Sequence, residues 1–362
     1  MSNFNFHDYF VLLPFIVFFL SFWVFFLKNN FYSVRITPDK NDVLKNSKFL
    51  KKVHHNFLIN WNFINFINFL LFFYLIKLDF NSFWFNHLKV NNFLINILLI
   101  VIFISFFLIF LLKFLKNSNV NYNIDYFSSL FNLNIFIPLI FLSNNMYTFV
   151  FLLELNSILI LYKFSVSRNW FKKDDFFIKN KNTFDRLLPK AYLNMLFFQY
   201  WANFFSTMLI MFSLFNIIYI YGSSEWFLIN FLNYCNYNRP YNFNDNFFIF
   251  LWIPFFIGLF LKIGFTPLHL FKIEVYKGIP FISIFFYTTV YFLSFFLYFV
   301  LIILYNINSF KFFWSFLFFI FILTGILYTI ILLFDVNLTK AFFAYSTIVN
   351  SLTFIIILFL SL

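Results

Sequence analysis

The chain has 362 residues, of which 63% are hydrophobic and 10% charged, and its formal net charge is +12. A soluble domain carries about 25% charged residues, so this composition excludes a soluble globular protein and predicts a membrane protein with many spans. The positive charge could indicate binding to nucleic acid, but membrane topology explains it better, and we expect no nucleic-acid partner.

The residue usage is strongly biased, with 73 Phe against only 5 Gly and 8 Pro. Phe, Ile, Asn and Lys have A/T-rich codons, whereas Gly, Pro and Ala have G/C-rich codons. We interpret the bias as drift in a small A/T-rich genome, which favours an organelle-encoded protein. The start of the sequence lacks the features of a secretory signal or a transit peptide, so we expect an uncleaved first membrane helix there.

Apolar runs of about 17–25 residues predict ten membrane-spanning helices and an all-α polytopic fold. In chain order the spans cover residues 9–27, 57–77, 92–114, 126–143, 146–164, 190–221, 246–267, 280–305, 311–334 and 341–361. We expect three regions: helices one to three in residues 1–125, helices four to eight in 126–305, and helices nine and ten in 306–362.

Two loops rich in lysine and arginine, residues 28–56 and 163–190, follow odd-numbered helices, whereas the loop 222–245 has one Arg and two acidic residues. The positive-inside rule places the basic loops on the matrix or cytoplasmic side. Loop 163–190 also has aromatic residues among its lysines. It could lie along the surface as an amphipathic segment, or it could be a disordered basic loop.

Two charged residues fall near the middle of a span, Glu154 and Lys262. A charge inside a membrane is costly, but two opposite charges are tolerated if they face each other or share water. Such a pair predicts a proton path, because a proton taken up by one group changes the affinity of the other for its own proton. The alternative is a static ion pair that only holds two helices together.

A helix break follows the lysine, because Pro267 comes five residues after Lys262. Proline removes a backbone donor, and a membrane tolerates the resulting break only where it is buried or lines a polar cavity. The break favours a path over a purely structural pair. Gly258 and Gly264 nearby would allow local deformation.

Other polar residues extend the expected axis. His269 titrates near neutral pH if unperturbed, so it could pass protons between helices, or it could be a hydrogen-bonded structural residue. Thr288 and Tyr291 follow on the next helix as possible polar-axis residues.

No motif for soluble catalysis or cofactor binding is present. The sequence lacks a glycine-rich phosphate loop, a zinc-protease motif, a CxxC pair and a nucleophile elbow. A single cysteine, Cys235, excludes an intrachain disulfide and a thiolate metal cluster. We therefore expect this chain to bind no cofactor and no metal.

Residues 262–280, KIGFTPLHLFKIEVYKGIP, resemble the pattern FKLxxxPFHxWxPDVYxGxP of the antiporter-like membrane subunits of respiratory complex I. Among these subunits, the residues of this segment most resemble the pattern of the NADH dehydrogenase subunit 2 family. Three other segments resemble the family in the same order: 153–158 its fifth helix, 198–222 its sixth, and 337–348 its tenth. The resemblance covers about residues 126–362.

The resemblance implies an antiporter-like fold with a discontinuous seventh helix, and a proton-translocating subunit of NADH:ubiquinone oxidoreductase in the mitochondrial inner membrane. The family's fifth-helix glutamate and seventh-helix lysine take part in proton translocation and correspond to Glu154 and Lys262. The family's basic stretch before AYSS corresponds to Lys340, a matrix-edge residue that could serve topology alone. FMN, iron–sulfur clusters and ubiquinone would belong to the complex as a whole. Other membrane-arm subunits and membrane lipids would be the partners.

The chain departs from the family pattern in two ways. The family usually has a second lysine on the eighth helix, thirty residues after the first, where this chain has Phe292. The relay could be rerouted through His269, or the chain could be a structural subunit that conducts no protons. A stand-alone cation/proton antiporter subunit is a further alternative.

The second departure is that the sequence ends at Leu362, whereas the family usually continues through a second broken helix. We therefore expect either a separate polypeptide from a split gene to supply the C-terminal helices, or the second half to have been lost.

Overall fold

The computed structural model describes residues 124–167, 181–237, 245–298, 311–334, 336 and 338–361, together with short stretches between residues 70 and 107. The first three expected spans and the basic loop 28–56 lie wholly or largely outside the described residues. The chain divides into two compact units, Met1–Ser143 and Asn144–Leu362.

In the first unit, two short strands and one helix are described. Strands β1 (Ser82–Phe83) and β2 (Leu88–Lys89) pair antiparallel, with Ser82 opposite Lys89. Helix α4 (Ile124–Phe141) coincides with the fourth expected span. The amide of Lys89 donates a hydrogen bond to the Leu142 carbonyl at 2.7 Å, which ties the strand pair to the end of α4.

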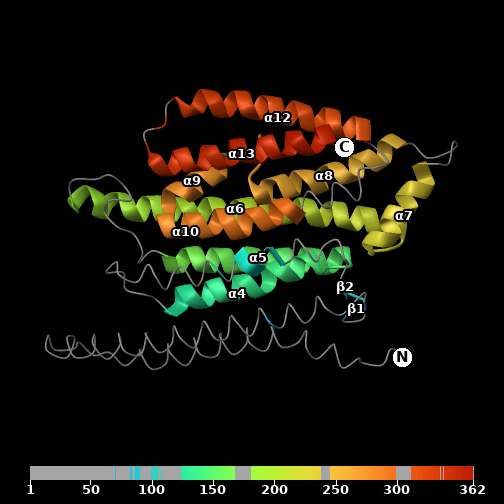
Figure 1. Ribbon diagram of the computed structural model, residues 1–362, viewed down its shortest axis with the longest axis horizontal. Coiled ribbons are helices and arrows are strands. Elements are labelled where there is room, and N and C mark those ends of the chain that lie inside the picture. Colours follow the sequence, from blue (N-terminus) through green and yellow to red (C-terminus); the bar gives the residue numbers. More distant parts are fainter. Residues whose placement is uncertain are drawn as a thin grey trace. The chain divides into compact units, whose positions relative to one another are not determined.

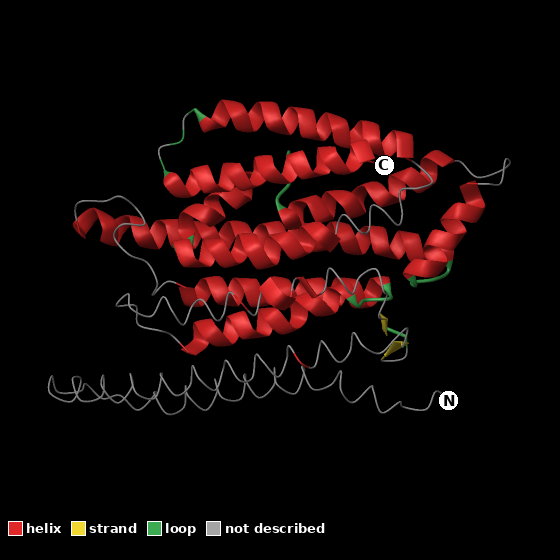
Figure 2. Cartoon of the chain, in the orientation of Figure 1, coloured by secondary structure: helices red, strands yellow, loops and turns green. Residues whose placement is uncertain are grey.

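In the second unit the described residues are almost entirely helical (Figures 1 and 2). The elements are α5 (Met146–Val166), α6 (Lys181–Tyr221), α7 (Trp226–Tyr237), α8 (Asp245–Ile263), α9 (Leu270–Gly278), α10 (Phe281–Phe286), the π-helix η4 (Tyr287–Phe292), α12 (Lys311–Leu333) and α13 (Thr339–Ser361). The expected spans from 146–164 onward coincide with helices of this unit.

Helices occupy parts of two segments that we expected to be loops, so those two predictions are partly wrong. Residues 222–245 contain α7, because the apolar run WFLINFL forms a helix although it is too short to span a bilayer. In the expected loop 163–190, Lys163 lies inside α5, where it is buried, and Lys190 lies inside α6. Residues 168–180, including the expected amphipathic aromatic residues, lie outside the described part.

Helix α6, with 41 residues, is the element on which the second unit is built. It packs along α5, α8 and α9, while α13 packs against α9 and α12. At Gly278 of α9, a β-carbon would lie 2.3 Å from Cβ of Met195 and 2.6 Å from the Ala191 carbonyl. Only glycine therefore lets α9 approach α6 this closely.

An aromatic cluster joins the helices at one end of the unit. Phe149 of α5 stacks on Tyr298 with ring centroids 4.6 Å apart and meets Trp226 of α7 edge-on at 5.9 Å. The same ring lies 6.3 Å from Phe255 of α8. Aromatic pairs of this kind add about 0.5–1.5 kcal/mol each beyond the apolar area they bury.

Two of the described helical segments, Met146–Ser165 and Lys190–Tyr221, are long and apolar enough to cross a membrane by length and composition. Shorter apolar segments are Asn132–Phe141, Trp252–Ile263, Ser283–Tyr298 and Phe319–Leu333. Helix α6 also exposes large apolar side chains, among them Phe197, Phe205, Phe212 and Phe215. Such a surface suits a hydrocarbon environment better than water.

Candidate functional site

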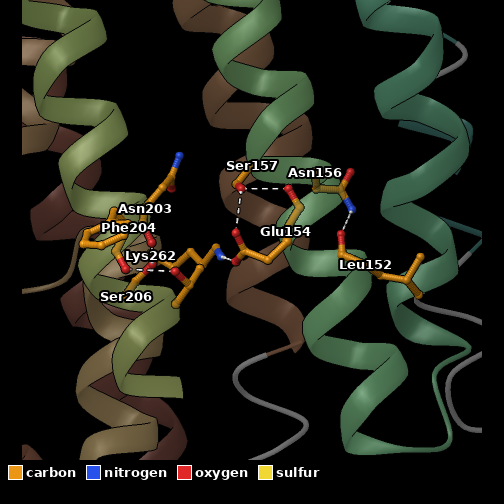
Figure 3. Close-up of polar contacts among 9 residues, drawn as sticks. Leu152, Glu154, Asn156, Ser157, Asn203, Phe204, Ser206 and Lys262 are labelled. Carbon is orange, nitrogen blue, oxygen red and sulfur yellow. Dashed lines mark hydrogen bonds and ion pairs between the residues drawn. The ribbon is translucent and has the colours of Figure 1, made fainter. Parts of the chain in front are cut away.

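The site is centred on a contact between α5 and α8. Glu154 lies in the middle of α5, and Lys262 lies in the last turn of α8. The Lys262 ammonium donates a hydrogen bond to Glu154, with Nζ 2.5 Å from Oε1 (Figure 3). The lysine side chain is 0% exposed and that of the glutamate 34%. The two charges that we expected to face each other therefore lie in direct contact, with the carboxylate nearer the surface.

Two polar side chains lie close to Glu154 in the sequence of α5, and one of them contacts its carboxylate. The Ser157 hydroxyl donates to the Glu154 carbonyl at 2.7 Å and reaches Oε2 at 3.4 Å. Asn156 is buried, and its Nδ2 donates to the Leu152 carbonyl at 2.8 Å. Glu154 thus meets the lysine with one carboxylate oxygen and the serine with the other (Figure 3).

A polar face of α6 lies opposite the lysine. Gln199, Asn203 and Ser206 are all buried and recur at helical spacing. A β-carbon at Gly258 of α8 would meet the Ser206 carbonyl at 2.9 Å, whereas Gly278 of α9 meets Ala191 and Met195. Gln199 and Asn203 lie between these two contacts along α6, so they face the end of α8 and the residues that follow it.

The chain between α8 and α9 forms the break. Gly264 follows α8 in the left-handed region, with φ of 78°, which glycine adopts at no steric cost. The amides of Gly264 and Phe265 both donate to the Phe260 carbonyl. Thr266 Oγ1 donates to the Phe321 carbonyl of α12 at 3.3 Å. Helix α12 therefore covers the break, which begins at Gly264, whereas α8 runs through Gly258.

His269 occupies the N-cap position of α9, without a capping hydrogen bond from its side chain, and is buried. Its ring meets Tyr328 of α12 edge-on at 5.5 Å. Neither ring nitrogen makes a well-formed hydrogen bond to a described residue, although the ring lies near the Pro267 backbone. The structure thus places His269 at the break.

The other expected polar-axis residues have different surroundings. Tyr291 of η4 is buried, and it lies close enough to Glu154 for electrostatic interaction. Thr288 of η4 donates to carbonyls of the preceding helix α10, at Ile284 and Phe285. The buried Lys340 donates to the Ile279 carbonyl at 2.8 Å. It therefore ties α13 to the end of α9.

Several buried polar atoms at the site have no hydrogen-bond partner among the described residues. They are both amide atoms of Gln199, Nδ2 of Asn203, both ring nitrogens of His269, Nζ of Lys272 and the hydroxyl of Tyr291. Buried polar groups are nearly always hydrogen-bonded, to protein or to ordered water. Ordered water is the partner that can satisfy such unpaired buried groups.

Three of these residues were not among the candidates from the sequence: Gln199, Asn203 and Lys272. The helical spacing of Gln199, Asn203 and Ser206 in an apolar span was the signal for the α6 face. Lys272 stands among apolar residues in LFKIEVY, but a helix was not expected there.

Comparisons with known proteins agree with this architecture. Residues 195–361 match the model of the family NADH:quinone oxidoreductase/Mrp antiporter, transmembrane region. The chain is 34% identical over 88 residues to the uncharacterized mitochondrial protein ORF4 of Paramecium tetraurelia; the match covers 24% of this chain and 56% of that protein.

Two solved structures share the fold. A chain of respiratory complex I from Thermus thermophilus with bound aureothin matches with a TM-score of 0.52 and 12% identity, over 84% of this chain and 62% of that one. A chain of the membrane-bound sulfane sulfur reductase, an archaeal respiratory membrane complex, matches with a TM-score of 0.55 and 12% identity, over 81% and 57%. The chain spans less than two thirds of the length of each relative.

Proposed function

We propose that this chain, whose residues 195–361 match the model of the NADH:quinone oxidoreductase/Mrp antiporter transmembrane family, is a proton-translocating membrane-arm subunit of a mitochondrial complex I. The family match, the mitochondrial relative and the fold shared with respiratory complexes support the proposal. The sequence pattern at residues 262–280 favours the subunit 2 type. In this proposal FMN, the iron–sulfur clusters and ubiquinone are bound by other subunits, and this chain carries protons only.

The observation that carries the proposal is the buried contact between Lys262 and Glu154 beside unpaired polar groups. An ion pair that served only to join two helices would need no polar surroundings beyond its own partners. Here Gln199 and Asn203 present further polar atoms from α6 opposite the break. Water bonded to these atoms would connect the pair to the break and supply a route for protons.

The local backbone suits a lysine that changes its protonation state. In the proposal α8 and α9 are the two halves of one discontinuous seventh span, and Lys262 lies in the last turn of α8. The C-terminal end of a helix carries partial negative charge, which stabilises an ammonium there. A proton gained by Glu154 removes the lysine's counter-charge, so a change at one group is felt by the other. A conformational or electrostatic change elsewhere in the complex can then move the proton onward.

Two other functions have specific observations in their favour. Phe292 stands where the resembled family usually has a second lysine, which favours a structural subunit that conducts nothing. The matching family model covers Mrp antiporters as well as NADH:quinone oxidoreductases, which favours a stand-alone cation/proton antiporter. The organellar composition and the mitochondrial relative weigh toward complex I.

The test is to isolate the chain from mitochondria with an affinity tag and to assay the material for NADH:ubiquinone oxidoreductase activity. We expect the activity to co-purify and, after reconstitution into liposomes, to acidify the lumen. If the isolated chain instead exchanges Na⁺ for protons in liposomes and carries no NADH oxidation, the antiporter function replaces the proposal. If the activity co-purifies but the number of protons pumped per NADH does not change when Lys262 is substituted, the chain is a structural subunit that conducts no protons.

A further inference from the structure

Lys272 is a further buried lysine, on α9, the helix that follows the break after Lys262. It lies in the first turn of α9 and is completely buried. A β-carbon at Gly264 would lie 3.0 Å from Lys272 Cδ, so the lysine stem runs back across the residue that follows α8. Its Nζ ends 3.7 Å from the centroid of the Phe292 ring. The side chain therefore bridges from α9 across the break to η4.

The surroundings stabilise an ammonium here only weakly. Nζ has no hydrogen-bond partner in the described part of the chain. A desolvated cation–π contact supplies about 2 kcal/mol, whereas burying an unpaired ion costs several kcal/mol. Lys272 also lies near the N-terminus of α9, where the helix dipole disfavours a positive charge. A static structural cation is therefore a poor explanation of this lysine.

Protonatable groups lie on both sides of the break. Lys262 and its partner Glu154 lie before it, His269 lies at its far end, and Lys272 follows one turn later in α9. The Lys272 amide donates to the His269 carbonyl at 3.0 Å, and the two side chains are close enough to interact electrostatically. Tyr328 of α12 lies against the His269 ring, and Tyr291 of η4 lies near Glu154. The break thus holds a sequence of proton acceptors and donors.

We infer that Lys272 is a second proton-carrying amine, which takes a proton from the Lys262 side of the break and passes it to the His269 side. The inference rests on the proposed function. In each transfer one N–H bond breaks on the donor and one forms on the acceptor, directly or through water, so total charge is conserved. The Lys272 amine lies over the ring of Phe292. In this proposal α9 therefore supplies an amine beside a position of η4 that itself carries an aromatic ring.

The experiment uses the assembled, reconstituted complex and measures protons pumped per NADH oxidised for Lys272→Met, Lys272→Arg and Lys262→Met. Arginine keeps the charge and the ring contact but does not give up its proton. We expect pumping per NADH to fall by roughly half or more in both Lys272 variants, because an intramembrane ionisable group on a path is not replaceable by a fixed charge. Pumping that stays at the wild-type level in both, or that only Lys272→Arg retains, would overturn the inference.

A rescue variant tests whether pumping needs an amine in this region or the Lys272 side chain itself. Phe292→Lys combined with Lys272→Met moves the amine to η4, to the region that Nζ occupies now. We expect this double variant to recover pumping that Lys272→Met loses. No recovery, or a Lys272→Met chain that fails to assemble, would count against the inference, since removing an unpaired buried charge should not unfold the chain.

The Lys262→Met arm keeps the two proposals apart. If Lys262→Met stops pumping and both Lys272 variants pump normally, the role of Lys272 is wrong and the proposed function stands. If Lys262→Met also pumps normally, the proposed function itself fails.

Discussion

Lys262 on α8 and Glu154 on α5 are 108 positions apart in the chain, and their charged atoms meet at 2.5 Å. The lysine side chain has no exposed surface, so the carboxylate is its counter-charge. Breaking a buried pair from one side leaves the other charge without compensation, which is more costly than removing both. This asymmetry gives the first prediction.

Glu154→Gln should destabilise the chain more than the double substitution Glu154→Gln with Lys262→Met. We expect a loss of about 2–3 kcal/mol for the single variant, below the roughly 3–5 kcal/mol of a fully buried pair because the carboxylate is partly exposed. Thermal unfolding of the complex in detergent measures both. Equal melting temperatures for the single and double variants would show that Lys262 does not depend on this carboxylate.

Gln199→Leu should leave stability unchanged or improve it, because both amide atoms lack a partner in the described residues. The same change should lower proton pumping per NADH, because it removes polar atoms that would bind water near the break. Ser213→Ala is the matched control on α6, since the Ser213 hydroxyl donates to the Ile210 carbonyl of its own helix. Normal pumping in Gln199→Leu would mean that the α6 face is not on the path.

Lys340→Met should behave as a structural change. It removes the 2.8 Å hydrogen bond to the Ile279 carbonyl at the C-terminal end of α9, which we expect to cost about 1.5–3 kcal/mol because the donor is charged. The fraction of assembled complex should fall, while each assembled complex pumps normally. Lys340→Arg is the control that keeps a donor. A lower proton yield per assembled complex would instead place Lys340 on the path.

Gly325→Ala should disturb the break from the side of α12. A β-carbon there would lie 2.1 Å from Thr266 Oγ1 and 2.4 Å from Thr266 Cβ, and overpacking of this kind costs about 1–3 kcal/mol. Thr266→Gly in the same chain removes the clashing atoms, so the double variant should recover part of the loss. Additive losses, measured by thermal unfolding, would show that α12 does not pack on the break through these residues.

The sequence was sufficient for the long helices and for the charge pair, because both depend on local patterns. Apolar runs predicted α5, α6, α8, α12 and α13, and the rarity of charge inside a span singled out Glu154 and Lys262. The short helices α7 and α9 were not predicted, because the stability of a short helix comes from packing. For α9, that packing is the close approach of Gly278 to Met195 on α6.

Lys272 was missed for the same reason. Its importance lies in a fold-back across Gly264 onto Phe292, which no spacing in the sequence reports. Lys340 was expected at the membrane edge through resemblance alone, whereas its contact with Ile279 is visible only in three dimensions. Both residues are buried lysines, so residue type does not distinguish the proposed proton carrier Lys272 from the structural residue Lys340. Their hydrogen-bond partners do.

The most direct test of the central claim is the number of protons pumped per NADH oxidised by the reconstituted complex carrying Lys262→Met. We predict that the variant complex assembles and still oxidises NADH when an artificial electron acceptor is added. The number of protons pumped per NADH should fall clearly below the wild-type value. An assembled Lys262→Met complex with the wild-type proton yield would contradict it.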